Sequence, residues 1–501
     1  MPSAYQFSPR VSRIALRSLT GESGAVPDGH AILARALRGL GVERRPVLLD
    51  SAAGWPRESS LLAFDPLPAP VPQRFEELRA YAEQLSAVEG GDEVPGPFHG
   101  GFLGALAYDL GVPGEVQAMR AEPWGFPLIV GGLYTDFLVY REGSDALELV
   151  LGDSPGDGRP DPNERRDALT ECLRAALARE RSPLVARAEL VRHTARETHM
   201  ANVEETRRRI ARGDFYQANL AHRFTRRVSG SPGELYLQLR EANPAPYAAY
   251  LHWRDEHGRE GALCSSSPEL LLELGEVGGL RTARTRPIKG TTRRSLDPTE
   301  DRQHAEALLA SEKDRAELAM IVDLERNDLG RTAKTGSVRV EALHALRSYE
   351  RVHHLTADVV SEPRSECDAW QVLGAVFPGG SVTGAPKLAS MESIGELESE
   401  GRGFFCGSLG FIDTRGHAHF NLLIRTVLWR PEEDEPSAST SGRPGEVSFR
   451  VGGGITWGSE AADEDSETLA KASAMMDAIE SRPFDSSQPS GRPASLPNSP
   501  L

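Results

Sequence analysis

Short apolar segments bounded by turn residues recur along the first third of the chain. Segments of this length and composition predict β-strands. They cover residues 46–52, 60–68, 128–142 and 146–153. Further along, residues 215–224 alternate between apolar and polar side chains, which is the two-residue period of a half-buried strand.

A helical pattern appears between these strands and dominates the middle of the chain. It predicts helices over 164–180 and 196–212, the second ending at Gly213, and a long charged helix that runs from 299 through 330. Shorter helices are predicted over 366–376 and from Pro386 onwards. Strands follow over 407–413, 418–429 and 446–456. This mixture of antiparallel-looking strands and helices predicts an α+β fold.

Four regions follow from the distribution of these patterns. Residues 1–30 are polar and weakly patterned, which predicts a flexible N-terminal arm. The segment 181–193 is the candidate boundary between an N-terminal region, 31–190, and a C-terminal region, 195–483. The Pro/Ser-rich residues 484–501 predict a disordered tail, and the hydrophilic insert 430–445 predicts a hairpin loop.

Composition narrows the class of function. The chain has 501 residues, with 57 Lys plus Arg against 73 Asp plus Glu and a formal charge of -16. That balance argues against a general nucleic-acid binder, which needs cationic surface, and an anionic substrate would need a local cation cluster or a metal ion. The four cysteines are isolated in sequence, and no apolar window reaches the length of a membrane span. We therefore expect a cytoplasmic protein with no membrane contact.

Two carboxylates near the C-terminus form the first candidate for chemistry. Glu464, Glu467 and Lys471 are spaced so that all three share one face of a predicted helix. Acidic residues are also favoured at a helix N-terminus by its dipole, so a merely well-charged helix start explains the same spacing. The functional interpretation is a hard cation, because magnesium prefers oxygen ligands and keeps some of its waters.

A third carboxylate could complete such a site. Glu317 precedes an apolar stripe in its helix, which predicts that it starts on the core-facing side. A carboxylate placed there needs a partner, because burying an unpaired charge is costly. Asp323 and Asp328 of the same helix are alternative ligands, although Asp328 is expected at the polar helix end.

Two glycine clusters and one arginine could hold anions. Residues 378–387 combine three glycines with Ser381 and Thr383 just before a helix, where free N–H groups bind anions well. Gly452–Gly454 form the second cluster, and the fork of donors on Arg425 could hold a carboxylate. Together with the acidic residues, they describe a site for a small dicarboxylate and a divalent metal.

Lys289 is the most ambiguous of the charged residues. It lies in an arginine-rich segment, 281–294, where a solvated cation is the ordinary outcome. However, Pro287 and Gly290 flank it, and this pairing presents one side chain from a defined backbone. The local sequence leaves both interpretations open.

Eight motifs, taken in order, resemble the chorismate-utilising enzymes, the family that includes the large subunits of aminodeoxychorismate synthase and anthranilate synthase. They are GDFYQANLAHRF, SSSPELLL, TRPIKGT, KDRAELAMIVDLERNDLGR, PGGSVTGAPK, RGFFCGSLGFI, NLLIRT and VGGGIT with ETLAKA. The resemblance implies two face-packed antiparallel β-sheets with outer helices, in which the N-terminal and C-terminal regions share one core. Residues 195–483 would be the chorismate-binding catalytic region.

The resemblance also implies roles for individual residues. Glu317, Glu464 and Glu467 would bind Mg²⁺, which with Lys471 would hold the ring carboxylate of chorismate. Arg425, Gly452 and Gly453 would hold the enolpyruvyl carboxylate. Glu269 resembles the general acid at the C4 hydroxyl, and His354 matches the active-site histidine. Further substrate contacts are expected at Thr383, Gly384, Thr291, Gln217 and Phe405, the last standing where the family commonly has tyrosine or tryptophan.

Two positions separate the branches of this family. Isochorismate and salicylate synthases have a lysine base where this chain has Gln217. Anthranilate synthases typically have PIAGT, whereas aminodeoxychorismate synthases have PIKGT, as here. Lys289 would then add to C2 of chorismate as an amine nucleophile. The alternatives are the anthranilate branch and a non-catalytic subunit. A non-catalytic subunit should lack one of Glu269, Glu317 and Glu467, and this chain has all three.

The resemblance further implies partners. Ammonia would come from a separate glutamine amidotransferase subunit in a heterodimer, because no amidotransferase region is expected in the chain. The segment LLDSA resembles one that binds tryptophan in some members, and Ser51 is the candidate contact.

Overall fold

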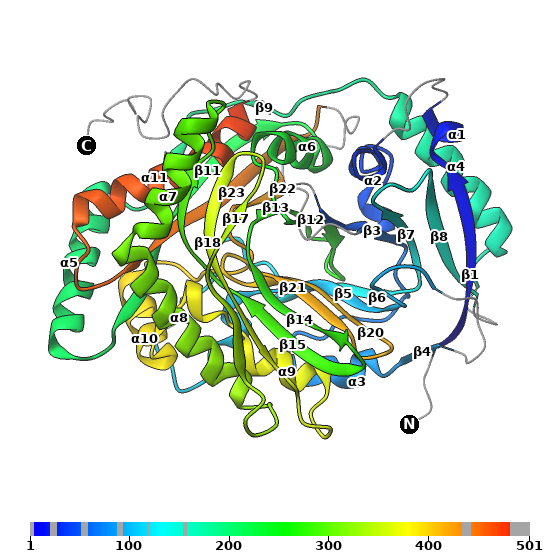
Figure 1. The fold of residues 1–501 in the computed structure, drawn as a ribbon. Coiled ribbons are helices and arrows are strands. Elements are labelled where there is room, and N and C mark those ends of the chain that lie inside the picture. Colours follow the sequence, from blue (N-terminus) through cyan, green and yellow to red (C-terminus); the bar gives the residue numbers. More distant parts are fainter. Residues whose placement is uncertain are drawn as a thin grey trace.

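A computed structural model describes residues 5–20, 28–51, 59–87, 94–118, 120–153, 158–432 and 442–480. The predicted tail and most of the insert 430–445 lie outside these residues. Two large β-sheets pack face to face, and helices cover their outer faces (Figure 1). The predicted α+β fold with two sheets and outer helices is confirmed.

The larger sheet has fourteen strands from both halves of the chain. Its strands, in spatial order, are β10 (Val191–Arg192), β11 (Gln217–Ser229), β23 (Pro444–Ile455), β22 (Thr426–Pro431), β13 (Glu260–Ser267), β12 (Tyr247–Arg254), β2 (Val47–Asp50), β3 (Ser59–Phe64), β7 (Asp136–Arg141), β8 (Ala146–Asp153), β1 (Tyr5–Ala15) and β4 (Leu85–Ala87). The short strands β9 (Val185–Ala186) and β19 (Gly384–Ala385) also pair with β11. All of these pairs are antiparallel except β1 with β4.

The smaller sheet has nine strands. Their order is β16 (Ile288–Arg293), β18 (Val352–Ser361), β15 (Leu280–Arg286), β14 (Leu270–Val277), β21 (Ala418–Asn421), β20 (Ser408–Asp413), β5 (Gly101–Leu106) and β6 (Ile129–Tyr134), with β17 (Arg339–Ser348) also paired to β18. Because β5 and β6 belong to this sheet and β2 and β3 to the other, the N-terminal region contributes to both.

Three apolar clusters account for the layers. One lies between the sheets, where Leu263 and Phe137 of the larger sheet pack with Phe411 of the smaller one. The other two lie between each sheet and its helices. Burial of apolar area on both faces of each sheet is the main stabilising term for such an arrangement.

The helices occupy the outer layers. They are α1 (Leu16–Thr20), α2 (Gly29–Ala36), α3 (Leu78–Ala82), α4 (Pro162–Ala178), α5 (Arg196–Arg212), α6 (Pro232–Ala242), α7 (Pro298–Ala310), α8 (Glu312–Gly330), α9 (Ala369–Val376), α10 (Lys387–Leu397) and α11 (Ala461–Glu480). Short 3₁₀ turns cover Val42–Arg44, Phe75–Glu77, Tyr108–Gly111 and Gly380–Val382. No helix among the described residues is long and apolar enough to cross a membrane.

Two predictions of secondary structure are corrected. The single helix expected from 299 to 330 is two helices, because Ser311 adopts an extended conformation and its side chain caps α8 by accepting from the Asp314 N–H. Residues 5–20, expected in a flexible arm, form β1 and α1 instead. β1 pairs with β8 over eight residues, from Ser8 to Ala15, so its backbone hydrogen bonds hold it in the sheet.

A third difference from the predicted secondary structure concerns residues of the candidate site. The single strand predicted over 418–429 is divided into β21 of the smaller sheet and β22 of the larger sheet. The chain therefore crosses between the sheets over residues 422–425. It crosses again at 268–269, between β13 and β14.

Candidate active site

Glu269 lies at the crossing between β13 and β14, where the chain passes from the larger to the smaller sheet. Its backbone carbonyl accepts the N–H of Leu422, so this crossing is bonded to the one over residues 422–425. The side chain is 4% exposed, and Ser381 Oγ donates to its carboxylate at 2.6 Å. Burial raises the pKa of Glu269 to about 7, although the Ser381 hydrogen bond and the Lys289 charge oppose this. A carboxyl with this pKa can donate a proton near neutral pH.

Lys289 lies on β16 at the edge of the smaller sheet. Its side chain is 14% exposed, and its ammonium is 3.9 Å from a carboxylate oxygen of Glu317. Burial lowers the pKa of Lys289, against the opposing charge of Glu317. Of the two interpretations left open by the sequence, the solvated cation does not describe this side chain.

The third glycine of the second cluster brings Lys289 close to the larger sheet. A Cβ on Gly454 would lie 3.1 Å from Lys289 Nζ and 2.7 Å from Gln217 Nε2. Gln217 is 0% exposed, and neither polar atom of its amide has a hydrogen-bond partner in the described structure. Lys289 Nζ and an unpaired amide thus both lie next to the place that a side chain at position 454 would fill.

α11 brings Glu464 against the same glycine cluster. A Cβ on Gly453 would lie 2.9 Å from Glu464 Oε2, and Ser459 Oγ donates to Glu464 Oε1 at 2.6 Å. Burial and the charge of Glu467 raise the pKa of Glu464. Lys471 Nζ lies 2.8 Å from Glu467 and donates to the Gly452 carbonyl at 3.1 Å.

Lysines surround all three candidate metal ligands. Burial alone would raise the pKa of Glu467, but the charge and hydrogen bond of Lys471, together with the charges of Lys313 and Lys289, outweigh it and the pKa is lowered. Lys313 lies 4.0 Å from Glu317 and also acts on the charges of Glu464 and Glu467. The three glutamates therefore face one region of positive charge.

This donor set fits magnesium. All three glutamates offer oxygen, and Glu464 is buried beside a second carboxylate, an arrangement that a dication relieves. Magnesium keeps several of its waters, so the carboxylates need not touch one another to hold it.

Arg425 and His354 complete the candidate site. Within the described part of the chain, no side chain forms a hydrogen bond or ion pair with the Arg425 guanidinium, and burial lowers its pKa. A half-buried guanidinium without a carboxylate partner is suited to an anion. His354 Nδ1 lies 2.8 Å from Thr291 Oγ1, and burial followed by the Arg425 charge lowers the pKa of His354 to about 3. The His354 ring is therefore neutral.

Other predicted contacts have structural partners already. The Thr383 hydroxyl donates to the Gly379 carbonyl. Gly384 has a φ of +139°, and the Gln217 carbonyl oxygen occupies the place that a Cβ at this position would need. Phe405 is buried, with the Arg402 guanidinium 5.8 Å from its ring. Ser51 Oγ donates to the Ser59 carbonyl. Their roles toward substrate or tryptophan stay predictions.

The expected place of Asp328 is corrected. It is 3% exposed and forms a 2.6 Å ion pair with Lys387, so it is a buried anchor rather than part of a polar helix end. Asp323, the other alternative ligand, is exposed and paired with Arg326.

Comparison with known proteins identifies the family of this chain. The sequence profile of chorismate binding enzymes matches residues 47–477. The chain belongs to the chorismate-binding enzyme family. It is 35% identical over 387 residues to aminodeoxychorismate synthase component 1 of Klebsiella aerogenes, covering 77% of this chain and 78% of that protein.

Two further relatives belong to another branch. Anthranilate synthase component 1 of Aquifex aeolicus is 42% identical over 278 residues, covering 56% of this chain and about half, 52%, of that protein. The crystal structure of anthranilate synthase component I from Streptococcus pneumoniae is 26% identical with a TM-score of 0.68, covering 84% of this chain and 92% of that one. The chain is thus a chorismate-utilising enzyme, and the comparisons do not separate the two branches.

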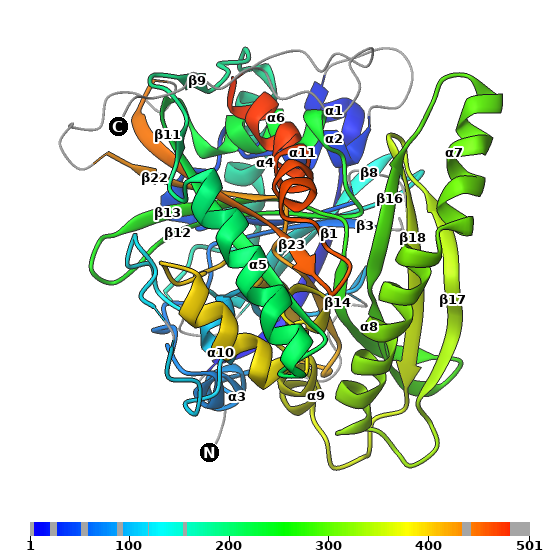
Figure 2. The same ribbon diagram turned by 90° about the vertical axis from the view of Figure 1, so that its left-hand side faces the viewer.

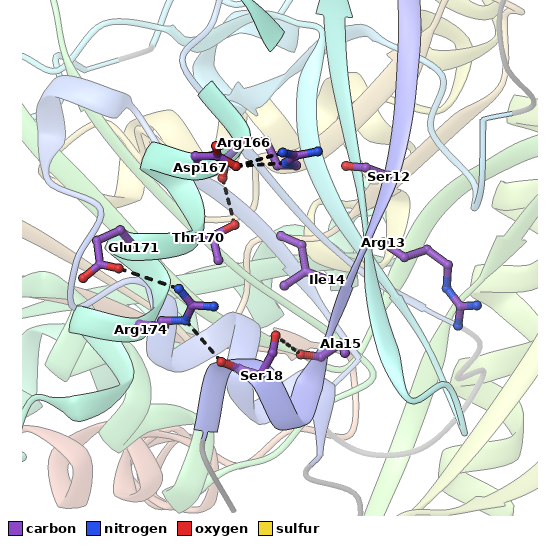
Figure 3. A pocket seen from close by; sticks show the side chains of 10 residues that line it. All are labelled: Ser12, Arg13, Ile14, Ala15, Ser18, Arg166, Asp167, Thr170, Glu171 and Arg174. Carbon is purple, nitrogen blue, oxygen red and sulfur yellow. Dashed lines mark hydrogen bonds and ion pairs between the residues drawn. The ribbon is translucent and has the colours of Figure 1, made fainter. Parts of the chain in front are cut away.

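A surface hollow between β1 and α4 is lined by none of the candidate active-site residues (Figure 3). Its charged groups pair locally: Arg166 with Asp167, Arg174 with Glu171, and Arg13 with Asp145. Each of the charged side chains that line it is therefore already paired with a neighbour.

The sequence did not reveal the hydrogen-bond and charge partners of the candidate site residues. Ser381 was placed in an anion-binding loop, but its hydroxyl holds Glu269. Ser459 and Lys313 were not singled out. Their signals in sequence are weak, because Ser459 precedes its helix in a loop and Lys313 is one of several charges on α8.

Proposed function

We propose that this protein is a cytoplasmic aminodeoxychorismate synthase component I. It converts chorismate and ammonia to 4-amino-4-deoxychorismate, for 4-aminobenzoate and folate synthesis, through a covalent bond to Lys289. The observation that carries the proposal is the buried Lys289 ammonium beside Gly454, with its pKa lowered, in a site whose acid Glu269 has its pKa raised to about 7. A desolvated lysine is a usable amine nucleophile.

The first step joins Lys289 to the substrate. The neutral amine attacks C2, both conjugated ring double bonds shift by one position, and the C4–O bond breaks. Glu269 gives its proton to the departing oxygen, which leaves as water. The products of this step are a secondary ammonium at Lys289 and an ionised Glu269 carboxylate.

The second step restores the enzyme. Ammonia adds at C4, both ring double bonds shift back, and the bond from C2 to Lys289 breaks, leaving a neutral lysine amine. The new ammonium at C4 gives one proton to Glu269. Chorismate and ammonia are thereby converted to aminodeoxychorismate and water, with the enolpyruvyl group retained.

Binding groups hold the two carboxylates of chorismate. Arg425 and the backbone N–H groups of Gly452 and Gly453 would bind the enolpyruvyl carboxylate. Glu317, Glu464 and Glu467 would hold Mg²⁺, which when bound attracts the ring carboxylate and neutralises its charge.

Gln217 explains why water does not compete effectively. An amide cannot take a proton from water as a lysine base can. Ammonia would be supplied by a separate glutamine amidotransferase subunit, consistent with the words "component 1" in the names of relatives.

Anthranilate synthase is the second candidate function. The 42% identity to the Aquifex aeolicus enzyme favours it, whereas the amine at position 289 favours aminodeoxychorismate synthase. Both activities begin from chorismate and ammonia, so the product separates them.

Product identification tests the proposal. The purified chain is incubated with chorismate, Mg²⁺ and ammonium, and the products are identified by liquid chromatography and mass spectrometry. Aminodeoxychorismate without pyruvate is the expected result, and anthranilate with pyruvate contradicts it. Mass spectrometry of protein quenched during turnover should find the adduct on the peptide containing Lys289.

A further inference from the structure

Asp465 is a buried carboxylate that the proposed chemistry does not use. It is 1% exposed and directly follows Glu464 on α11. Three side chains bind it: Arg192 Nη2 at 2.5 Å, His199 Nδ1 at 3.0 Å and Arg196 Nε at 3.3 Å. A buried carboxylate with three donors is held in one geometry.

A second set of contacts holds α11 one helical turn further along, at Thr468. Thr468 Oγ1 donates to the Asp465 carbonyl at 2.8 Å and lies 3.0 Å from His222 Nε2. Because the hydroxyl proton is used toward the carbonyl, His222 Nε2 is the donor to Thr468. His222 stands opposite Val451 in the pairing of β11 with β23, one residue before Gly452.

These contacts fix one face of α11 while another face carries the proposed ligands. Successive helical residues point about 100° apart, so residues 465 and 468 share one face and residues 464, 467 and 471 share the next. α5 and α11 lie beside each other in Figure 2, and the partners of Asp465 come from α5 and β10. A small rotation of α11 would move Glu464 away from Gly453.

His199, His222 and Asp465 could also be interpreted as a metal site. They are the one set of three such residues in the described structure whose ligand atoms lie within 4.8 Å of one another. However, Arg192 and Arg196 already occupy the Asp465 carboxylate, and two nearby guanidinium charges repel a dication. The set is therefore better explained as an anchor.

We infer that Asp465 is a positioning residue for the proposed magnesium site. Its contacts to Arg192, Arg196 and His199 set the rotation of α11 that presents Glu464 and Glu467 beside Gly452 and Gly453. The inference rests on the proposed function, because it assumes that these glutamates bind the metal.

Metal binding by the full chain tests the inference. Mn²⁺ serves as the probe, and its free concentration is followed by electron paramagnetic resonance with Mg²⁺ as competitor. Asp465→Asn should raise the Mn²⁺ dissociation constant about tenfold, the lower end of the effect of losing a partner outside the ligand set. Turnover should recover at high Mg²⁺. Asp463→Asn removes the same charge from an exposed position of α11 and should bind Mn²⁺ as the parent does.

Milder changes keep the test valid if Asp465→Asn folds poorly. Arg196→Gln removes one contact from a half-exposed side chain and should raise the dissociation constant in the same direction by less. Asp465→Glu, which keeps the carboxylate, should bind Mn²⁺ more tightly than Asp465→Asn but less tightly than the parent. Parental affinity in both Asp465→Asn and Arg196→Gln overturns the inference.

Failure of the proposed function gives a different result. A parent chain that binds no Mn²⁺ overturns the positioning role, whereas its product from chorismate is measured separately. Formation of aminodeoxychorismate by that chain would leave the proposed reaction standing.

Discussion

The ammonium of Lys289 lies 3.9 Å from the carboxylate of Glu317, although the two residues come from a sheet edge and a covering helix. This contact joins the proposed nucleophile to the proposed metal ligands. Figure 2 shows α8, which carries Glu317, lying along β16 and β18. A metal ion that engages Glu317 would release Lys289 from its ion pair and lower its pKa further, since an opposing charge favours the ammonium.

Loss of the Lys289 amine should abolish turnover. Lys289→Ala removes the nucleophile, and Lys289→Arg keeps the charge but offers no neutral amine near neutral pH. Both variants should show background levels of product by liquid chromatography while retaining chorismate binding by calorimetry. Lys334→Ala, which removes an exposed lysine paired with Glu362, is the matched control. Product formation by Lys289→Ala near the parental rate contradicts the covalent route.

Ser381→Ala should move the pH dependence of the reaction. Glu269 must be protonated to act as an acid, so kcat/KM should fall as pH rises past about 7, the pKa raised by burial. Ser381 donates to the carboxylate and so lowers this pKa. Without that hydrogen bond the pKa of Glu269 rises, and the alkaline limb of the profile should shift to higher pH. An unchanged limb in Ser381→Ala assigns it to another group.

Glu269→Gln should reduce activity and increase stability in a pH-dependent way. Loss of a general acid lowers kcat about 10²–10⁴-fold. The folded pKa of about 7 lies above the ordinary 4.5, so the stability associated with this carboxyl is present below pH 4.5 and is lost as pH rises through 7. The difference corresponds to at most about 3 kcal/mol. In thermal unfolding, the melting temperature of Glu269→Gln should therefore exceed that of the parent at pH 8 and match it at pH 4.5.

Gly454→Ala should impair catalysis more than folding. The new Cβ would lie within 3.1 Å of Lys289 Nζ and Gln217 Nε2, which are ends of flexible side chains and can move. Their displacement should lower kcat, whereas the melting temperature should change little. Gly458→Ala is the control, because nothing lies within 4 Å of its added Cβ. Equal kcat values for the two variants would show that Lys289 need not approach Gly454.

Much of the fold could be predicted from local patterns. The α5 helix ends at Gly213, as predicted, because glycine there adopts the left-handed conformation. The strand that contains the second glycine cluster was also predicted, over 446–456 against Pro444–Ile455 in the structure. The two-helix break at Ser311 was missed, because a serine that caps a helix resembles any other polar residue within a charged helical pattern.

The sequence by itself determined the residue types of the site and the family that contains them. It also indicated that the side chain at position 289 separates two branches. It left open whether Lys289 is solvated, because solvation depends on neighbours that are distant along the chain.

Only the tertiary structure decided the environment of each group. Glu269 and Arg425 lie at two crossings between the sheets, and burial there changes both of their pKa values. Lys289 is desolvated because β16, α8 and the backbone at Gly454 enclose it together. Asp465 becomes an anchor only where α5, β10 and α11 meet. Burial and long-range charge pairing arise from packing, and no local sequence pattern encodes them.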